Sequence, residues 1–184
     1  SSDLLYTDGI AYHHLSGSNL LIVFSIGHVY GQQQKLDSLL AVNNAYVKED
    51  SIKVTYLINV FRQYRRLENF EKVEEYGQKA IAVAKKLPLS FSLTTVYEKL
   101  GLCYHGASKY FQAIDNYTKG VEVAWKRNDK RKVAGFYLNL GALYNTLPDY
   151  AKSLEANQIA VGLYNELKDY NMISSCYMNI FQFF

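Results

Sequence analysis

The 184-residue sequence is poor in the residues from which disulfides, metal centres and catalytic sites are built. Its two cysteines, Cys103 and Cys176, lie far apart within helical patterns, so no local spacing supports a disulfide or a metal pair. The four histidines have no Cys, Asp or Glu at metal-ligand spacing, and no glycine-rich phosphate loop, nucleophile elbow or paired acidic motif occurs. These absences predict a segment without enzymatic activity, metal or cofactor.

An excess of charge of one sign and long apolar runs are also missing. Lys and Arg number 20 against 17 Asp and Glu, which gives a formal net charge of +3, and the basic tract at 130–132 is short. This balance is too mild to predict binding to nucleic acid. The apolar run at 20–26 is too short to span a bilayer. We therefore expect neither a nucleic-acid partner nor a membrane span.

What the sequence does contain is a pattern that returns every forty residues. Aromatic residues occur at Tyr64, Tyr104, Tyr144 and Phe184. Three further columns share this step: Tyr97, Tyr137 and Tyr177; Val60, Leu100, Leu140 and Ile180; and Phe70, Tyr110 and Tyr150. With aromatics at 15% of the chain, a four-aromatic column arises by chance in only about 2% of cases. The recurrence predicts an all-α array of stacked helix pairs.

The helices of one unit can be placed from residues 93–125. Leu93, Val96, Tyr97 and Leu100 follow the spacing of one helical face, and a second such face begins at Tyr110 after a break at 106–108. This pattern predicts two helices joined by a tight turn. Applied to the whole chain, it predicts units at 51–88, 89–128 and 129–168 and an incomplete unit at 169–184.

The N-terminal segment 1–34 does not follow the repeat. The run at 20–26 resembles the apolar core of a secretory signal, with Val29 and Gly31 as the small residues before cleavage. No Lys or Arg precedes the run, and the first methionine is Met172, so an artificial or misassigned extension is the alternative. A third interpretation is a strand-like or helical segment packed on the first unit. The segment predicts a periplasmic or extracytoplasmic location if it derives from a signal, and a cytoplasmic one otherwise.

The regions that flank the array lead to two further expectations. Residues 35–50 are predicted to form a short capping helix from Lys35 and a linker. At the other end, the helix expected within 169–184 has no partner helix in the sequence, and its apolar side includes Phe181, Phe183 and Phe184. Because terminal repeats normally carry a polar outer side, we expect the chain to be a fragment of a longer protein.

The unit resembles the tetratricopeptide repeat in a form with extended helices. The residues that carry the likeness are Tyr97, Leu100, Gly101, Tyr104, Tyr110, Ala113, Tyr117 and Gly120. The stretches 69–76 and 138–144 are similar to phrases of that family, and the resemblance covers residues 52–184. It implies an α-α superhelix, a right-handed solenoid that acts as a scaffold for protein partners. Phe61 and Phe181 replace Gly101 and Gly141 of the pattern, which bears on how closely the first and last helix pairs approach.

A narrower resemblance concerns the signal-like start, the lead-in at 33–40 and the forty-residue units. Together they are similar to sensory repeat regions that precede histidine kinase or DNA-binding output modules in bacterial signalling proteins. This likeness implies the sensory or interaction part of a larger signalling protein. The alternatives are a peptide-responsive regulator that clamps an output domain, and a purely structural oligomerisation spacer.

In arrays of the family that the unit resembles, the first helix of each unit lines the concave side. Its polar residues beside the buried stripe are therefore the candidate peptide-binding residues. They are Asn59, Arg62, Arg65, Lys99, His105, Asn139, Asn145 and Asn179. Side-chain amides can bond the backbone of an extended peptide, and Arg62, Arg65 and Lys99 could hold a carboxylate. The alternative is an ordinary solvated face of amphipathic helices.

Overall fold

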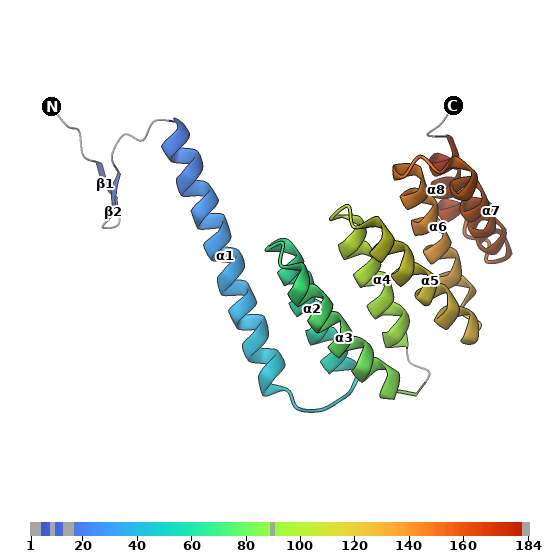
Figure 1. The fold of residues 1–184 in the computed structure, drawn as a ribbon, viewed down its shortest axis with the longest axis horizontal. Helices are drawn as coiled ribbons and strands as arrows, with labels where there is room; N and C mark the ends of the chain where they lie inside the picture. The colour runs from blue at the N-terminus through green and yellow to red at the C-terminus, as the bar shows by residue number, and fades with distance from the viewer. Residues whose placement is uncertain (1–4, 8–9, 13–16, 89–90, 182–184) are drawn as a thin grey trace.

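The computed structural model describes residues 5–7, 10–12, 17–88 and 91–181, with side chains from Val29 onward except at Phe91 (Figure 1). Helices make up most of these residues, as the repeat pattern predicts. A short antiparallel hairpin precedes them, formed by β1 (Leu5–Thr7) and β2 (Ile10–Tyr12). A strand-like segment is one of the interpretations given above for 1–34, but no pattern in the sequence locates the two strands. Residues 182–184, with the predicted apolar Phe183 and Phe184, lie outside the described part, as do 1–4, 8–9 and 13–16 of the N-terminal segment.

The helices follow the forty-residue step. After α1 (Gly17–Ala45) come α2 (Ser51–Arg66), α3 (Phe70–Lys86), α4 (Phe91–His105), α5 (Tyr110–Lys126), α6 (Lys130–Thr146), α7 (Tyr150–Glu166) and α8 (Tyr170–Phe181). Three helical hairpins, α2–α3, α4–α5 and α6–α7, stack in order, and α8 packs on α6 and α7 (Figure 1). The second helices of the hairpins begin at Phe70, Tyr110 and Tyr150, as predicted.

Five turns, those that follow α2, α4, α5, α6 and α7, share one backbone design. In each of these turns, a residue with positive φ lies just after the preceding helix. The next residue donates its backbone N–H to a carbonyl of the preceding helix and is also the N-cap of the following helix. Asp149 shows this: its N–H donates to Tyr144 O at 2.9 Å, and its Oδ1 accepts from Lys152 N at 3.2 Å. The residues with positive φ in these turns are Glu68, Ser108, Asn128, Pro148 and Lys168.

Close approach within and between hairpins depends on glycine. A Cβ at Gly101 would lie 2.3 Å from Cε1 of Tyr117, whose ring is fully buried against it. A Cβ at Gly120 would lie 2.2 Å from Cζ of Phe136, across the α5–α6 boundary. Phe61, which replaces a glycine of the pattern in the first unit, is itself fully buried. The first hairpin therefore buries an aromatic ring where the second has glycine.

Helix α1 differs from the expected short capping helix. The pattern predicted a helix from Lys35, whereas α1 begins at Gly17, so the proposed boundary after residue 34 falls inside a continuous helix. The reason is that the apolar run at 20–26 shows no helical periodicity, and a helix without an amphipathic pattern leaves no signal. Leu36 of α1 is buried, and α1 packs on α2 as α3 packs on α4.

Polar contacts fix α1 to the first hairpin. Gln63 of α2, almost fully buried, donates from Nε2 to Gln32 O at 2.8 Å and to Gln32 Oε1 at 2.7 Å. Lys53 donates from Nζ to the carbonyls of Asn43 and Tyr46 at the end of α1, at 2.6 and 2.8 Å. The two bonds from Lys53 satisfy carbonyls that a helix end leaves without an internal partner.

The first helices of the units lie on the inner side of the array. Helices α2, α4, α6 and α8 contact one another in sequence, whereas in the described residues α3, α5 and α7 make no contacts with each other. Elements on the inside of a curved stack lie closer together than those on the outside, so the first helices face inward. Within the part of the chain that the structure describes, no helix has both the length and the apolar character needed to cross a membrane.

Candidate functional site

The inner face carries a cluster of positive charge where α2 meets α4. Arg62, Arg65 and Arg66 follow the i, i+3, i+4 spacing of one side of α2, and Lys99 faces them from α4. We call these four residues the basic cluster. Together with Leu102 and Cys103 they line a cavity of about 280 Å³.

The charges of the basic cluster are only partly neutralised. Arg65 donates from Nη2 to the backbone carbonyl of Gly106 at 2.7 Å, and Arg66 donates to the neutral amide of Gln63 at 3.2 Å. Lys99 lies 3.3 Å from Glu98, which also pairs with another lysine. Among the side chains that the structure describes, no carboxylate lines this cavity. The arrangement therefore favours an anion, since guanidinium groups bind carboxylates strongly.

Cys103 lies at the edge of the basic cluster as a buried thiol. Burial raises the pKa of its thiol, although the charges of Arg65, Arg62 and Lys99 act in the opposite direction. The thiol is therefore protonated at neutral pH and packs as a small apolar group.

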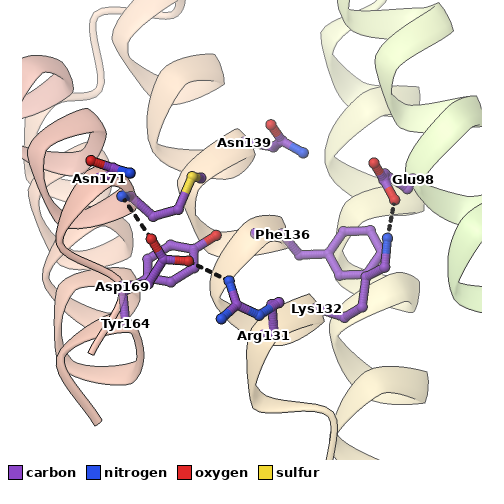
Figure 2. Close-up of a pocket in the computed structure, with 10 residues that line it drawn as sticks. Glu98, Arg131, Lys132, Phe136, Asn139, Tyr164, Asp169 and Asn171 are labelled. Carbon is purple, nitrogen blue, oxygen red and sulfur yellow. Dashed lines mark hydrogen bonds and ion pairs between the residues drawn. The ribbon is translucent and has the colours of Figure 1, made fainter. Parts of the chain in front are cut away.

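A second cavity, of about 450 Å³, lies further along the inner face between α4, α6 and the start of α8 (Figure 2). We call it the inner pocket. Its lining comes from the first helices, except for Tyr164 of α7 and Asp169 of the α7–α8 turn. The lining residues are Glu98, Arg131, Lys132, Gly135, Phe136, Asn139, Tyr164, Asp169, Asn171 and Met172.

The charges around the inner pocket cancel in pairs. Lys132 donates to Glu98 at 2.6 Å, and Arg131 is bonded to Asp169 (Figure 2). Burial acts to raise the pKa of Glu98, but the bonds from Lys132 and Lys99 outweigh it and the pKa is lowered. The bond from Arg131 lowers the pKa of Asp169. Both carboxylates are therefore ionised at neutral pH, and the pocket offers no net charge.

The remaining wall of the inner pocket is mixed in chemistry. Met172 supplies apolar surface above the buried Phe136, and Asn139 and Asn171 supply amides from α6 and α8. Burial, followed by nearby negative charge, raises the pKa of Tyr164 to about 12, so its phenol keeps its proton. Figure 2 shows the two amides on one side of the pocket and Arg131 and Lys132 on the other.

The structure brings some of the predicted groove residues together and separates others. Arg62, Arg65 and Lys99 meet in the basic cluster, and Asn139 lines the inner pocket. Asn145 and Asn179 are bonded between helices: Asn145 Nδ2 donates to Asn179 O at 2.8 Å. The other two predicted residues line neither cavity. They are Asn59, half-buried on α2, and His105, whose ring lies 6.3 Å from that of Tyr110.

Most of the inner pocket was missed by reasoning from the sequence. One side of α6 carries four lining residues at i, i+3, i+4 and i+7, which are Lys132, Gly135, Phe136 and Asn139. Helical spacing from Asn139 would therefore have found the other three. The ion pairs join residues 34 and 38 positions apart, and no local pattern shows them. In the described residues no group of three His, Cys, Asp or Glu could hold a metal ion.

No model of a known protein family matches this chain, and no curated protein matches it. Solved structures do match its fold. BtubC (BKLC) from P. vanneervenii superimposes with a TM-score of 0.63 at 17% identity, over 89% of this chain and 71% of that one. A kinesin-light-chain-like protein of Podosopora anserina with nearly identical TPR-like repeats gives 0.60 at 14% identity, over 82% and 80%.

A third similar structure belongs to a larger protein. It is the Signal Transduction ATPase with Numerous Domains (STAND) protein with a tetratricopeptide repeat sensor from Pyrococcus horikoshii. The TM-score is 0.66 at 20% identity, and the match covers 89% of this chain but only 26% of that one. At such identities the similarity concerns the fold alone. It is the fold of helical repeats that the sequence pattern predicts.

Proposed function

We propose that this chain, which has the fold of tetratricopeptide-like repeats, binds an extended segment of a protein partner on its inner face. The observation that carries the proposal is the basic cluster, in which three arginines and a lysine converge on a cavity without a carboxylate in its described lining. An acidic side chain or a terminal carboxylate supplies the missing charge. A repeat scaffold for protein interaction, without catalysis of its own, is the general role of this fold.

The arrangement of α4 supports an extended ligand rather than a compact one. Lys99 lines the basic cluster and the preceding residue, Glu98, lines the inner pocket, so the two cavities adjoin across one helix. An extended chain advances about 3.3 Å per residue and can engage both within a few residues. Asn139 supplies a side-chain amide that can bond the peptide backbone.

The finer part of the proposal is that the array is the sensory part of a larger signalling protein. The forty-residue units and the lead-in at 33–40 support it, as does the similarity in fold to a signal transduction protein with a repeat sensor. The bacterial context rests on the sequence resemblance. A regulator that clamps an output domain would use the same face for an intramolecular segment, whereas an oligomerisation spacer would need no charge selectivity there.

Charge selectivity is therefore the test. Fluorescein-labelled ten-residue peptides of acidic, neutral and basic composition are titrated with the intact chain, and binding is followed by anisotropy. We expect the acidic peptides to bind, with affinity that falls as salt is added. Reversal of charge in Arg62→Glu with Lys99→Glu should abolish binding.

The matched control reverses two charges on the second helices, Lys85→Glu with Lys126→Glu, which changes the net charge by the same amount. Both lysines are exposed. The control should bind as the natural sequence does, and circular dichroism should show unchanged helix content in both variants. Equal binding of acidic and neutral peptides, or an equal loss in the control, would overturn the proposal.

A further inference from the structure

We propose that the inner pocket is a specificity site that takes one large, uncharged apolar side chain of the bound peptide, next to the acidic residue held by the basic cluster. This inference rests on the proposed function and names the class of segment that the array selects: an extended peptide in which acidic and apolar residues alternate within a few positions.

The size of the inner pocket is the first argument. Its volume of about 450 Å³ exceeds that of the cavity at the basic cluster and falls within the usual range of ligand sites, about 300–1,000 Å³. Met172, an adaptable thioether at the start of α8, is half-buried and supplies apolar wall, whereas Phe136 is 2% exposed and adds only a small apolar area at the base. Such a wall favours an apolar side chain over a polar one.

The pairing of charges is the second argument. Each cation at the pocket has its own carboxylate, Lys132 with Glu98 and Arg131 with Asp169. An acidic ligand group would face these carboxylates, and a basic one would face the two cations. Either would disrupt a formed ion pair and lose hydration without gaining a partner. An uncharged side chain leaves both pairs intact, in contrast to the basic cluster, where an anion is favoured.

The two amides give the third argument. Asn139 and Asn171 stand on the same side of the pocket in Figure 2, one from α6 and the other from α8. Each offers a donor and an acceptor to a peptide backbone. Backbone bonds on that side would fix the orientation of the ligand, so that its side chain enters the pocket beside Met172. The site thus combines apolar surface with a few placed polar groups, as binding sites usually do.

Gly135 keeps the pocket open. A Cβ added there would meet only the hydroxyl of Tyr164, at 3.6 Å, which is ordinary van der Waals contact. Nothing in the packing therefore requires glycine, although a glycine within a helix is destabilising relative to alanine. A longer side chain at this position would extend into the pocket and occupy it. Gly135 is consequently the position at which the inference can be tested without touching the ion pairs.

The first experiment compares Gly135→Leu with a matched control. Gly162→Leu changes the same residue types on α7, where an added Cβ meets nothing within 4 Å. The probes are acidic peptides that differ at one position by Ala, Phe, Lys or Glu. For the natural sequence we expect the Phe peptide to bind about tenfold more tightly than the Ala peptide. Gly135→Leu should remove this preference, so that the Phe and Ala peptides bind with similar affinity, whereas Gly162→Leu should keep the tenfold preference.

The second experiment separates this inference from the proposed function. N-acetylphenylalaninamide, which carries no charge, is titrated while amide shifts of Gly135, Asn139 and Asn171 are recorded by NMR. Saturable shifts that Gly135→Leu abolishes would support the inference even if no acidic peptide binds. Absence of shifts, or equal binding of all acidic peptides, would overturn it and leave the basic cluster unaffected. Asn139→Ala, which truncates an amide on the rim, is the second variant should Gly135→Leu fail to fold.

Discussion

Asn145 donates a hydrogen bond from Nδ2 to the backbone carbonyl of Asn179 at 2.8 Å, which joins α6 directly to α8. Asn179 in turn places its Nδ2 3.3 Å from Oδ1 of Asn157, a fully buried side chain of α7. Two of the asparagines predicted to bind a peptide therefore hold neighbouring units together. A role for them in the groove stays a prediction, and any substitution there also tests the packing of α8.

The first prediction concerns Asn179→Ala. The substitution leaves the buried Oδ1 of Asn157 without this donor, so we expect it to lower the free energy of unfolding by about 1–2 kcal/mol. Asn139→Ala, at a half-buried position beside the inner pocket, should change it by less than about 0.5 kcal/mol. Urea unfolding followed by circular dichroism measures both. Equal effects would show that the Asn157 bond adds nothing to stability.

The second prediction concerns the close contact at Gly101. In Gly101→Ala the new Cβ would lie 2.3 Å from Cε1 of Tyr117, and the fully buried ring has no free space into which to move. We expect a loss of about 1–3 kcal/mol. Gly162→Ala, with nothing within 4 Å, should instead stabilise the chain by about 0.5–1 kcal/mol. Thermal melts of the two variants should therefore shift in opposite directions, and a shared direction would contradict the packing described for α4 and α5.

The third prediction concerns the turns. Glu68 has φ of 56° and Asn128 has φ of 54°, but of these two residues only asparagine tolerates this region well. Glu68→Gly should raise the free energy of unfolding by about 0.5–1 kcal/mol, and Asn128→Gly should change it little. The midpoint of urea unfolding reports the difference. A larger gain at Asn128 than at Glu68 would argue against backbone strain as the cause.

The fourth prediction concerns pH. Burial lowers the pKa of His105 in the folded chain below the ordinary value of about 6.5. Above pH 6.5 the imidazole is neutral in both states, so this residue imposes no penalty. As the pH falls from 6.5 towards the folded pKa, the unfolded chain takes up the proton first, and stability decreases.

The measurement is the melting temperature between pH 7.5 and 5.0 for the natural sequence and for His105→Gln. The natural sequence should lose more stability over this window than the variant does. The ionised carboxylates of lowered pKa, such as Asp149 and Asp169, lose their contribution at lower pH and act equally in both proteins. Identical slopes would show that the burial of His105 does not affect its titration.

The fifth prediction concerns the attachment of α1. Gln63→Met keeps the length of the side chain and removes both bonds to Gln32. Because α1 packs on α2 and on no other helix in the described residues, we expect hydrogen exchange to accelerate in the part of α1 from Gln32 onward. Exchange in α5 to α7 should stay the same and serves as the internal control. Uniform acceleration along the chain would instead indicate global destabilisation.

Much of the fold follows from the sequence because repeated units repeat their buried positions. The last turn of each first helix contains one aromatic residue of the repeat, which is Tyr64, Tyr104 or Tyr144. Three helices begin after a capping side chain: α3 after Asn69, α6 after Asp129 and α7 after Asp149. These signals are local, so helical spacing and capping chemistry suffice to find them. The start of α1 could not be found in this way, since its first residues carry no amphipathic pattern.

The candidate site was only partly predictable for a related reason. Arg62 and Arg65 lie one turn apart on a single helix, so their meeting follows from helical geometry. The inner pocket depends instead on contacts between units, such as Lys132 with Glu98 and Arg131 with Asp169. Which side chains meet across units depends on the angle between helix pairs, and a single sequence does not give that angle.

The contact of first helices with one another, while α3, α5 and α7 stay apart in the described residues, has a mechanical consequence. A change in curvature must turn each hairpin about the line where α2, α4, α6 and α8 touch, with the outer helices moving through the larger arc. A peptide segment bound between α4 and α8 would fix the angle between neighbouring hairpins. Small rotations add along a stack, so occupancy of the inner face would be converted into a displacement of the far end of the array.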